Sequence, residues 1–181
     1  TSCKNQQGSP DPEMGATKKG NRYYYGMKVH VGVDSQTKVI HSLEVTPANV
    51  HDSQVVGQLL HGQEEEVYGD KAYVGQEATL QQKAPKARSC ILHRASRGRP
   101  LSAWQQRWNR LQNAVRAKVE HVFGTLKHRF GWRKVRFRGL AKNAQYAYAA
   151  AACVNIYHHR KTLLEYLWGS SGSPPAAFAF A

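Results

Sequence analysis

The chain has 181 residues, a length that suits one domain with a hydrophobic core. Its formal net charge is +14 and its sequence pI is about 9.9, which favours a nucleic acid or another anionic surface as the partner. Its three cysteines are far apart and predict neither a disulfide framework nor a zinc site, and no stretch is apolar enough to predict a membrane span.

The charge is distributed unevenly along the chain. Ten of the twelve acidic residues lie within the first 77 positions, whereas seventeen Lys and Arg residues lie between Lys83 and Lys142. Glu120 is the only acid between Glu77 and Glu165. A surface that binds a polyanion normally excludes carboxylates, so Glu120 has two competing interpretations. It is either the partner of Arg116 in a helix salt bridge or a metal ligand beside a nucleic-acid backbone.

The first half of the chain is predicted to be mostly strands. Residues 1–20 are polar and lack periodicity, which predicts an extended polar arm. Alternating apolar residues over 23–33 and an apolar run over 39–45 predict a hairpin, with turn residues at 34–37 between them. Asp52 is then expected to cap a short helix that ends near Leu60.

The second half is predicted to be mainly helical. A short strand at 67–68 ends at Gly69 and Asp70, a helix covers 76–83, another short strand covers 89–93, and a basic loop covers 96–100. Long helices are expected over 102–130 and 141–168, followed by a disordered tail at 169–181. This order of elements predicts a mixed α/β domain over residues 21–168.

The helix over 102–130 carries two distinct faces. One face is a predicted apolar stripe made of Trp104, Trp108, Leu111, Val115, Val122 and Leu126. At about 100° per residue, Arg116, Glu120 and Lys127 fall within roughly 40° of one another, roughly 110–120° from the centre of that stripe. An ordinary solvated face is the alternative interpretation of this arrangement.

Asp70 is the second candidate acid. It follows a short strand, and acids at the carboxyl ends of strands in α/β sheets often face a ligand crevice. Gly69 is interpreted as leaving room for a large substrate, and the alternative is that Asp70 is only a turn residue. Two acids on neighbouring elements among many cations predict a metal-dependent phosphoryl-transfer site, with Mg²⁺ on the carboxylates and DNA on the cations.

Several motifs, in the same order along the chain, resemble DDE transposases of the insertion-sequence-five family. They are the run from Lys18 to His30, the run from Thr46 to Ser53, the run from Tyr68 to Tyr73, and the spacing of Arg116, Glu120 and Lys127. The last of these matches the family's Tyr-Arg-Glu-Lys signature, and the resemblance covers residues 10–165.

The resemblance implies an RNase H-like mixed sheet with flanking helices, and Asp70 and Glu120 as the second and third catalytic carboxylates. Both would be metal ligands, with two Mg²⁺ or Mn²⁺ ions in the intact enzyme, and Arg116 and Lys127 would support them. Transposon ends and target DNA would be the partners, in a cytoplasmic, nucleoid-associated protein that has no membrane partner. The oligomeric state stays open, with a homo-oligomer among the options.

This sequence departs from the family's pattern at two places. Asn113 stands where the signature has Tyr. The family's first catalytic Asp precedes the segment that starts at Lys18, where this chain offers only Asp11, so the first strand and first Asp are expected to be missing. Asp34 and Asp11 are poor substitutes, because one lies in a predicted turn and the other between prolines, whereas Asp52 is assigned a supporting role.

Three functions compete on this basis. The first is a transposase fragment that carries two of the three carboxylates and is inactive in isolation, and the second is a remnant that binds DNA without cutting it. The third, a general RNA-binding protein, leaves Asp70 and Glu120 unexplained. In each DNA-binding case, the basic segment is expected to hold phosphates through Arg133, Lys134, Arg136 and Arg138.

Overall fold

The structure is a computed structural model that describes residues 10–168. The predicted tail at 169–181 and the start of the predicted arm therefore lie outside the described residues. The strands are β1 (Gly15–Lys19), β2 (Arg22–Val33), β3 (Ile40–Pro47), β4 (Glu66–Gly69) and β5 (Arg88–Ile91). The helices are α1 (Val56–Leu59), α2 (Glu77–Lys83), α3 (Ala103–His128) and α4 (Leu140–Trp168), with 3₁₀ turns η1 (Asp52–Gln54) and η2 (Lys71–Tyr73). The mixed α/β class is as predicted.

The larger sheet is antiparallel, in the order β1-β2-β3. The predicted hairpin corresponds to β2 and β3, in which Val29 pairs with Val45. β1 was not predicted, because its residues fall in the segment interpreted as a polar arm. It pairs with the start of β2 across a tight turn at Gly20, whose φ of 62° suits glycine.

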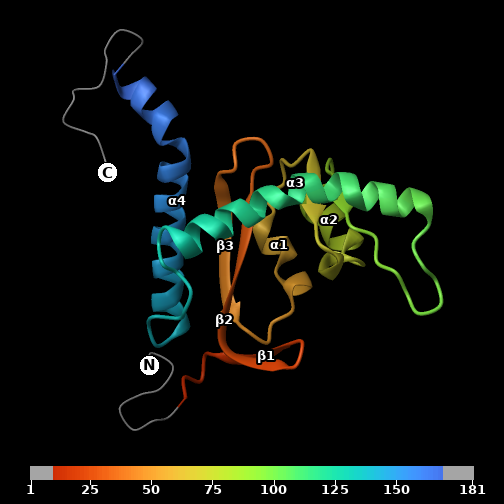
Figure 1. The fold of residues 1–181 in the computed structure, drawn as a ribbon, viewed down its shortest axis with the longest axis horizontal. Helices are drawn as coiled ribbons and strands as arrows, with labels where there is room; N and C mark the ends of the chain where they lie inside the picture. Colours follow the sequence, from red (N-terminus) through yellow and green to blue (C-terminus); the bar gives the residue numbers. More distant parts are fainter. Residues whose placement is uncertain (1–9, 169–181) are drawn as a thin grey trace.

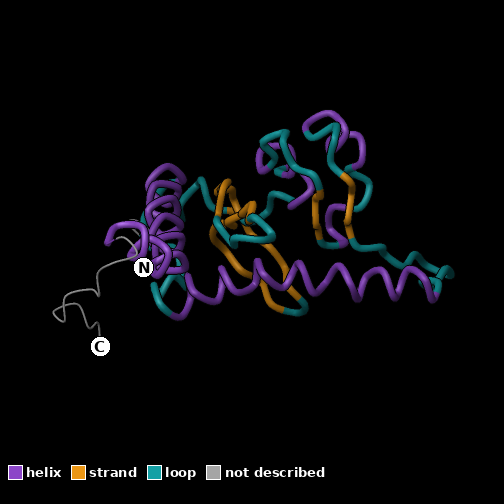
Figure 2. The backbone as a smooth tube through the Cα atoms, turned by 90° about the horizontal axis from the view of Figure 1, so that it is seen from above, coloured by secondary structure: helices purple, strands orange, loops and turns teal. Residues whose placement is uncertain are grey.

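The smaller sheet consists of β4 and β5, which run parallel, with Gly69 opposite Ile91. Within residues 10–168 no strand pairing joins this sheet to the larger one, so the strands do not form the single mixed sheet expected from the resemblance. In Figure 1, α3 crosses both groups of strands, and Figure 2 shows it running along one side of the elongated molecule.

The main core lies between β3, the second half of α3 and the middle of α4. Its most buried members are Val122, Leu126, Ala147 and Val154, which are at most 1% exposed. Alanines along α4 let that helix approach β3 closely, and Asn155 fixes the contact through two hydrogen bonds of 2.9 Å to the backbone of Ile40. This packing anchors the half of α3 that carries Glu120.

The first half of α3 differs from the prediction. Trp104 and Leu111, placed in the apolar stripe, are 63% and 61% exposed, because this half extends past the main core. Instead of entering a core, Trp104 stacks on Trp108 with ring centroids 5.6 Å apart. Asn109 is buried here and holds α3 to the backbone of His93 through hydrogen bonds of 2.8 and 3.0 Å.

Asp11 has a structural place in the fold. Its side chain is buried and accepts hydrogen bonds from the backbone N–H groups of Glu13 and Gly139, at 3.1 and 2.7 Å. Its carbonyl also accepts the Tyr25 hydroxyl at 2.6 Å. Asp11 therefore ties the segment before β1 to the start of α4, away from Asp70.

Candidate active site

Asp70 lies where β4 ends, as its sequence position predicted. Its side chain accepts the backbone N–H of Lys71 at 2.7 Å and so caps the turn η2. The interpretation of Gly69 as space for a substrate is not supported, because that glycine is buried. A Cβ at position 69 would lie 3.2 Å from the side chains of Ile91 and of Tyr73, so both neighbours would have to shift to admit one.

Arg116 joins the two candidate acids. Its Nη2 atom lies 3.5 Å from Glu120 Oε1, one helical turn later, and 3.9 Å from Asp70 Oδ2 on the smaller sheet. The helix salt bridge considered as the simple explanation of Glu120 is therefore present, and it extends to a second acid. Because both oxygens lie within 4 Å of one nitrogen, the carboxylates are neighbours in space.

Tyr73 lies beside this pair, although no individual role was predicted for it. Burial, together with the negative charges of Asp52 and Asp70, raises the pKa of Tyr73 to about 12, against a smaller opposing effect of Arg116. The phenol is therefore protonated at neutral pH and offers an O–H donor next to the acids. Its place in the motif with Asp70 was the only signal for it in the sequence.

Asp52 does not act as the helix cap that was predicted. The residue that caps η1 is His51, whose ring nitrogen accepts the backbone N–H of Ser53. Asp52 instead pairs with Lys28 on β2, with Nζ and Oδ1 3.1 Å apart. The competing ion pair explains the difference, because Lys28 draws the carboxylate toward the strand.

His30 stands next to Asp52 on the same strand as Lys28. Its Nδ1 lies 3.8 Å from Asp52 Oδ1, and its Nε2 shares a hydrogen bond of 2.9 Å with the hydroxyl of Thr46. Burial lowers the pKa of His30, and Lys28 lowers it further, while Asp52 partly compensates. The period-two alternation along β2 puts Lys28 and His30 on one face of the strand, and that was the available sequence signal.

The side chains of the candidate site can hold a divalent cation only if the substrate supplies further oxygen ligands. Within residues 10–168, no three His, Cys, Asp or Glu side chains gather closely enough to hold a metal ion. Asp70 and Glu120 supply two carboxylates, with side chains 48% and 69% exposed. Mg²⁺ commonly binds through one or two carboxylates, substrate phosphates and water, and the two acids fit that pattern.

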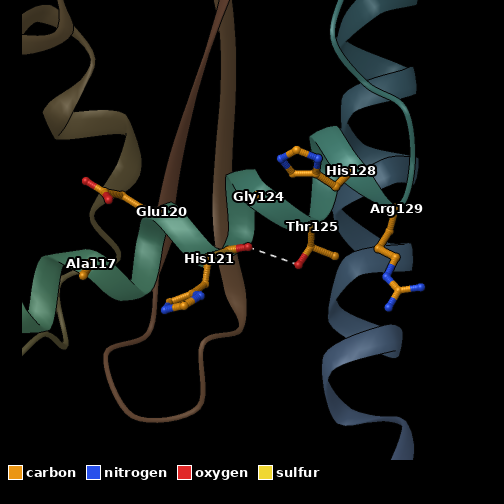
Figure 3. A pocket seen from close by; sticks show the side chains of 7 residues that line it. All are labelled: Ala117, Glu120, His121, Gly124, Thr125, His128 and Arg129. Carbon is orange, nitrogen blue, oxygen red and sulfur yellow. Dashed lines mark hydrogen bonds between the residues drawn. The ribbon is translucent and has the colours of Figure 1, made fainter.

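A shallow hollow of about 420 Å³ lies along α3 next to Glu120. Figure 3 shows Glu120 extending away from His121, while His128 and Arg129 line the far end of the hollow. Glu120 is the only acid that lines it among the described residues. The hollow thus combines one carboxylate with one guanidinium and two imidazole rings.

The cations expected to support the site take different places. Lys127 lies with its Nζ 6.0 Å from the centre of the Phe123 ring, and among the described residues no carboxylate forms an ion pair with it. Arg133 donates to the carbonyl of Lys127 at 3.3 Å, and Lys134 is exposed.

Two further members of the basic segment make intramolecular contacts. Arg136 stacks over the ring of Tyr146 at 5.4 Å. Arg138 donates to the carbonyl of Pro10 at 3.1 Å. Arg133, Lys134 and Arg136 are exposed, whereas Arg138 is half-buried.

These features define a mixed α/β domain in which two acids from separate elements meet at one arginine. The sequence model of the transposase DDE domain matches residues 2–156, and the chain belongs to that family. Membership implies transposase function and DNA as the partner. No solved structure matches the chain, and no helix among the described residues has the length and apolar character needed to span a membrane.

Proposed function

We propose that this chain is the catalytic portion of a DNA transposase of the insertion-sequence-five type, in which Asp70 and Glu120 supply two of the carboxylates for strand cleavage and transfer. The observation that carries the proposal is the shared contact of both acids with Arg116. A salt bridge within one helix involves only its own two residues, whereas a phosphoryl-transfer site needs acids from separate elements brought together.

Each residue has a distinct role in this proposal. Asp70 and Glu120 would hold Mg²⁺ or Mn²⁺, which when bound activates the attacking oxygen and stabilises the leaving oxygen. Arg116 keeps the two carboxylates aligned and, once they are engaged, is free to contact a phosphate oxygen. Tyr73, protonated at neutral pH, donates a hydrogen bond toward the same phosphate.

The supporting residues act through charge and position. Asp52 holds Lys28 beside the site at 3.1 Å, which adds a cation where the DNA backbone would approach. Lys127, Arg133 and Lys134 continue the cationic surface along and beyond α3. Phosphate contacts of this kind fix the DNA in register without reading its sequence.

Metal-directed cleavage tests the site directly. Fe²⁺ in place of Mg²⁺, with ascorbate and peroxide, should cut bound DNA and the polypeptide near Asp70 and Glu120. Asp70→Asn and Glu120→Gln should each abolish these cuts, whereas Glu77→Gln, an exposed acid on α2, should keep them. Equal cutting by the wild type and both site variants would refute the metal assignment.

DNA binding without cutting is the second candidate function. It is favoured by the absence of a three-ligand metal group among residues 10–168, since two-metal catalysis needs acids on both sides of the phosphate. A plasmid-nicking assay with Mg²⁺ and with Mn²⁺ separates the two functions. Nicks that Glu120→Gln removes would establish the enzyme, while tight binding without nicks would establish the binding protein.

A further inference from the structure

A groove separate from the hollow beside Glu120 lies between the β1–β2 hairpin, α3 and residues 132–135. It encloses about 710 Å³. Four cations line it, namely Lys28, Lys127, Arg133 and Lys134. No carboxylate does so among the described residues, although Glu13 and Asp52 lie nearby in the fold. A lining with this charge fits a polyanion.

Two of the cations in the groove connect it to the candidate active site. Lys28 lines the groove and also donates to Asp52 at 3.1 Å. The negative charge of Asp52, like that of Asp70, raises the pKa of Tyr73. Lys127 lies on the same helix as Glu120, two turns further on. Lys28 and Lys127 therefore connect the groove to the elements that surround the paired acids.

Aromatic rings add a second property to this lining. Tyr24 and Tyr25 on β2 line the groove and are 50% and 48% exposed, and the hydroxyl of Tyr25 is held by the carbonyl of Asp11. Trp132 lines it as well and packs edge-on against Tyr146, with centroids 5.9 Å apart. Trp132 is half-buried against the main core, whereas Tyr24 and Tyr25 are exposed. An exposed ring offers a face on which a flat ligand can stack.

Cations that follow a backbone, together with exposed aromatic rings, are the combination that binds single-stranded nucleic acid. A duplex keeps its bases paired and stacked, so its bases cannot lie on the exposed ring of Tyr24, whereas an unpaired strand can present them. We propose that this groove binds a single-stranded tract of DNA that adjoins the reacting phosphate. The identity of the ligand as DNA rests on the function proposed above.

The test compares single-stranded and duplex DNA on the whole chain. Fluorescence anisotropy would measure the Kd of a labelled thymidine oligonucleotide of about ten nucleotides and of a duplex of equal length, at fixed salt. Tyr24→Ala should weaken single-strand binding about tenfold, the effect of losing one stacked base, while Tyr24→Phe keeps the ring and the affinity. Tyr23→Ala is the matched control, because Tyr23 is 76% exposed but faces Lys18 outside the groove.

Duplex binding should stay within about twofold of wild type in all three variants. Unchanged single-strand affinity in Tyr24→Ala, or an equal loss in Tyr23→Ala, would overturn the groove assignment. Photo-crosslinking of the wild type to an iodouracil-substituted strand is the second measurement, and it does not depend on the variants folding. Crosslinks at Tyr24, Tyr25 or Trp132 are expected, and crosslinks only at other positions would refute the proposal.

The two proposals fail in distinguishable ways. If the Fe²⁺ cuts depend on Asp70 and Glu120 but Tyr24→Ala binds single strands normally, only the groove assignment is wrong. If the chain binds neither form of DNA, the proposed function itself is wrong, and the groove assignment fails with it.

Discussion

Asp70 and Glu120 belong to different elements, yet both carboxylates lie within 4 Å of the same guanidinium nitrogen of Arg116. The positive charge offsets a repulsion that two neighbouring carboxylates would otherwise feel. At about 4 Å in water, each such pair contributes about 1 kcal/mol, so Arg116 competes with any added cation for the same oxygens.

Replacing Arg116 should therefore strengthen metal binding in the absence of DNA. We expect Arg116→Gln to bind Mn²⁺ about tenfold more tightly than wild type in isothermal titration calorimetry, because both carboxylates lose their competing cation. Arg110→Gln, an exposed change on the same helix, should behave like wild type. Mn²⁺ affinity that Arg116→Gln leaves unchanged would show that the acids do not bind the ion together.

DNA affinity should depend steeply on salt. If several phosphates are neutralised, affinity should fall by about 10³ or more between 50 and 200 mM salt. The double variant Arg133→Gln, Lys134→Gln should reduce the slope of log K against log salt by about two, since each cation releases about one counterion. Lys161→Gln, on the exposed end of α4, should keep the wild-type slope. A slope that the double variant shares with wild type would move the DNA surface elsewhere.

Two glycines should respond oppositely to alanine. Gly69→Ala places a methyl group 3.2 Å from Ile91 and Tyr73 and should destabilise the fold by about 1–3 kcal/mol. Gly124→Ala adds a methyl group to α3 where no atom beyond its chain neighbours and the nearby helix backbone lies within 4 Å, and should stabilise it by about 0.5–1 kcal/mol. Urea unfolding followed by circular dichroism measures both, and a destabilised Gly124→Ala would contradict the open space described there.

Alkaline pH should weaken the fold through Tyr73. Its pKa is about 12 in the folded chain against an ordinary value of 10.0, so the unfolded chain loses this proton first and stability falls as pH rises from about 10 to about 12. Tyr73→Phe should lose less of its free energy of unfolding across this window, by at most about 2 kcal/mol. The stability curve of Tyr68→Phe serves as the comparison, because a hydrogen bond to Glu66, rather than burial, is the main cause that raises the pKa of Tyr68 to about 12. Parallel stability curves for wild type and Tyr73→Phe would contradict the burial of this phenol.

The regular elements could be predicted well where one side-chain pattern dominated. The alternation over 23–33 predicted β2, and the long helical periods predicted α3 and α4 to within two residues at each end. β1 escaped prediction because Gly15–Lys19 has no apolar alternation. It is extended only because β2 offers a pairing edge, and Asp11 and the buried Met14 hold the segment before it.

The candidate site was predictable only within each element. Helical spacing alone placed Arg116 beside Glu120, and strand position placed Asp70 at the end of β4. The contact between Arg116 and Asp70 joins elements far apart in the sequence. Neither the helical spacing of α3 nor the position of Asp70 after a strand predicts it. The pairing of Asp52 with Lys28, and the burial of Tyr73 between two acids, depend on tertiary packing in the same way.

The two hydrogen bonds between Asn109 and the backbone of His93 fix the rotation of α3 about its own axis at this point. Asp70 and His93 both follow strands of the smaller sheet. The number of residues between Asn109 and Glu120 therefore sets the side of α3 on which Glu120 faces Asp70. One residue inserted between positions 109 and 116 would turn Arg116 and Glu120 by about 100° and separate them from Asp70. The loop before α3 can change length without this penalty, whereas the helix segment that follows Asn109 has a fixed length.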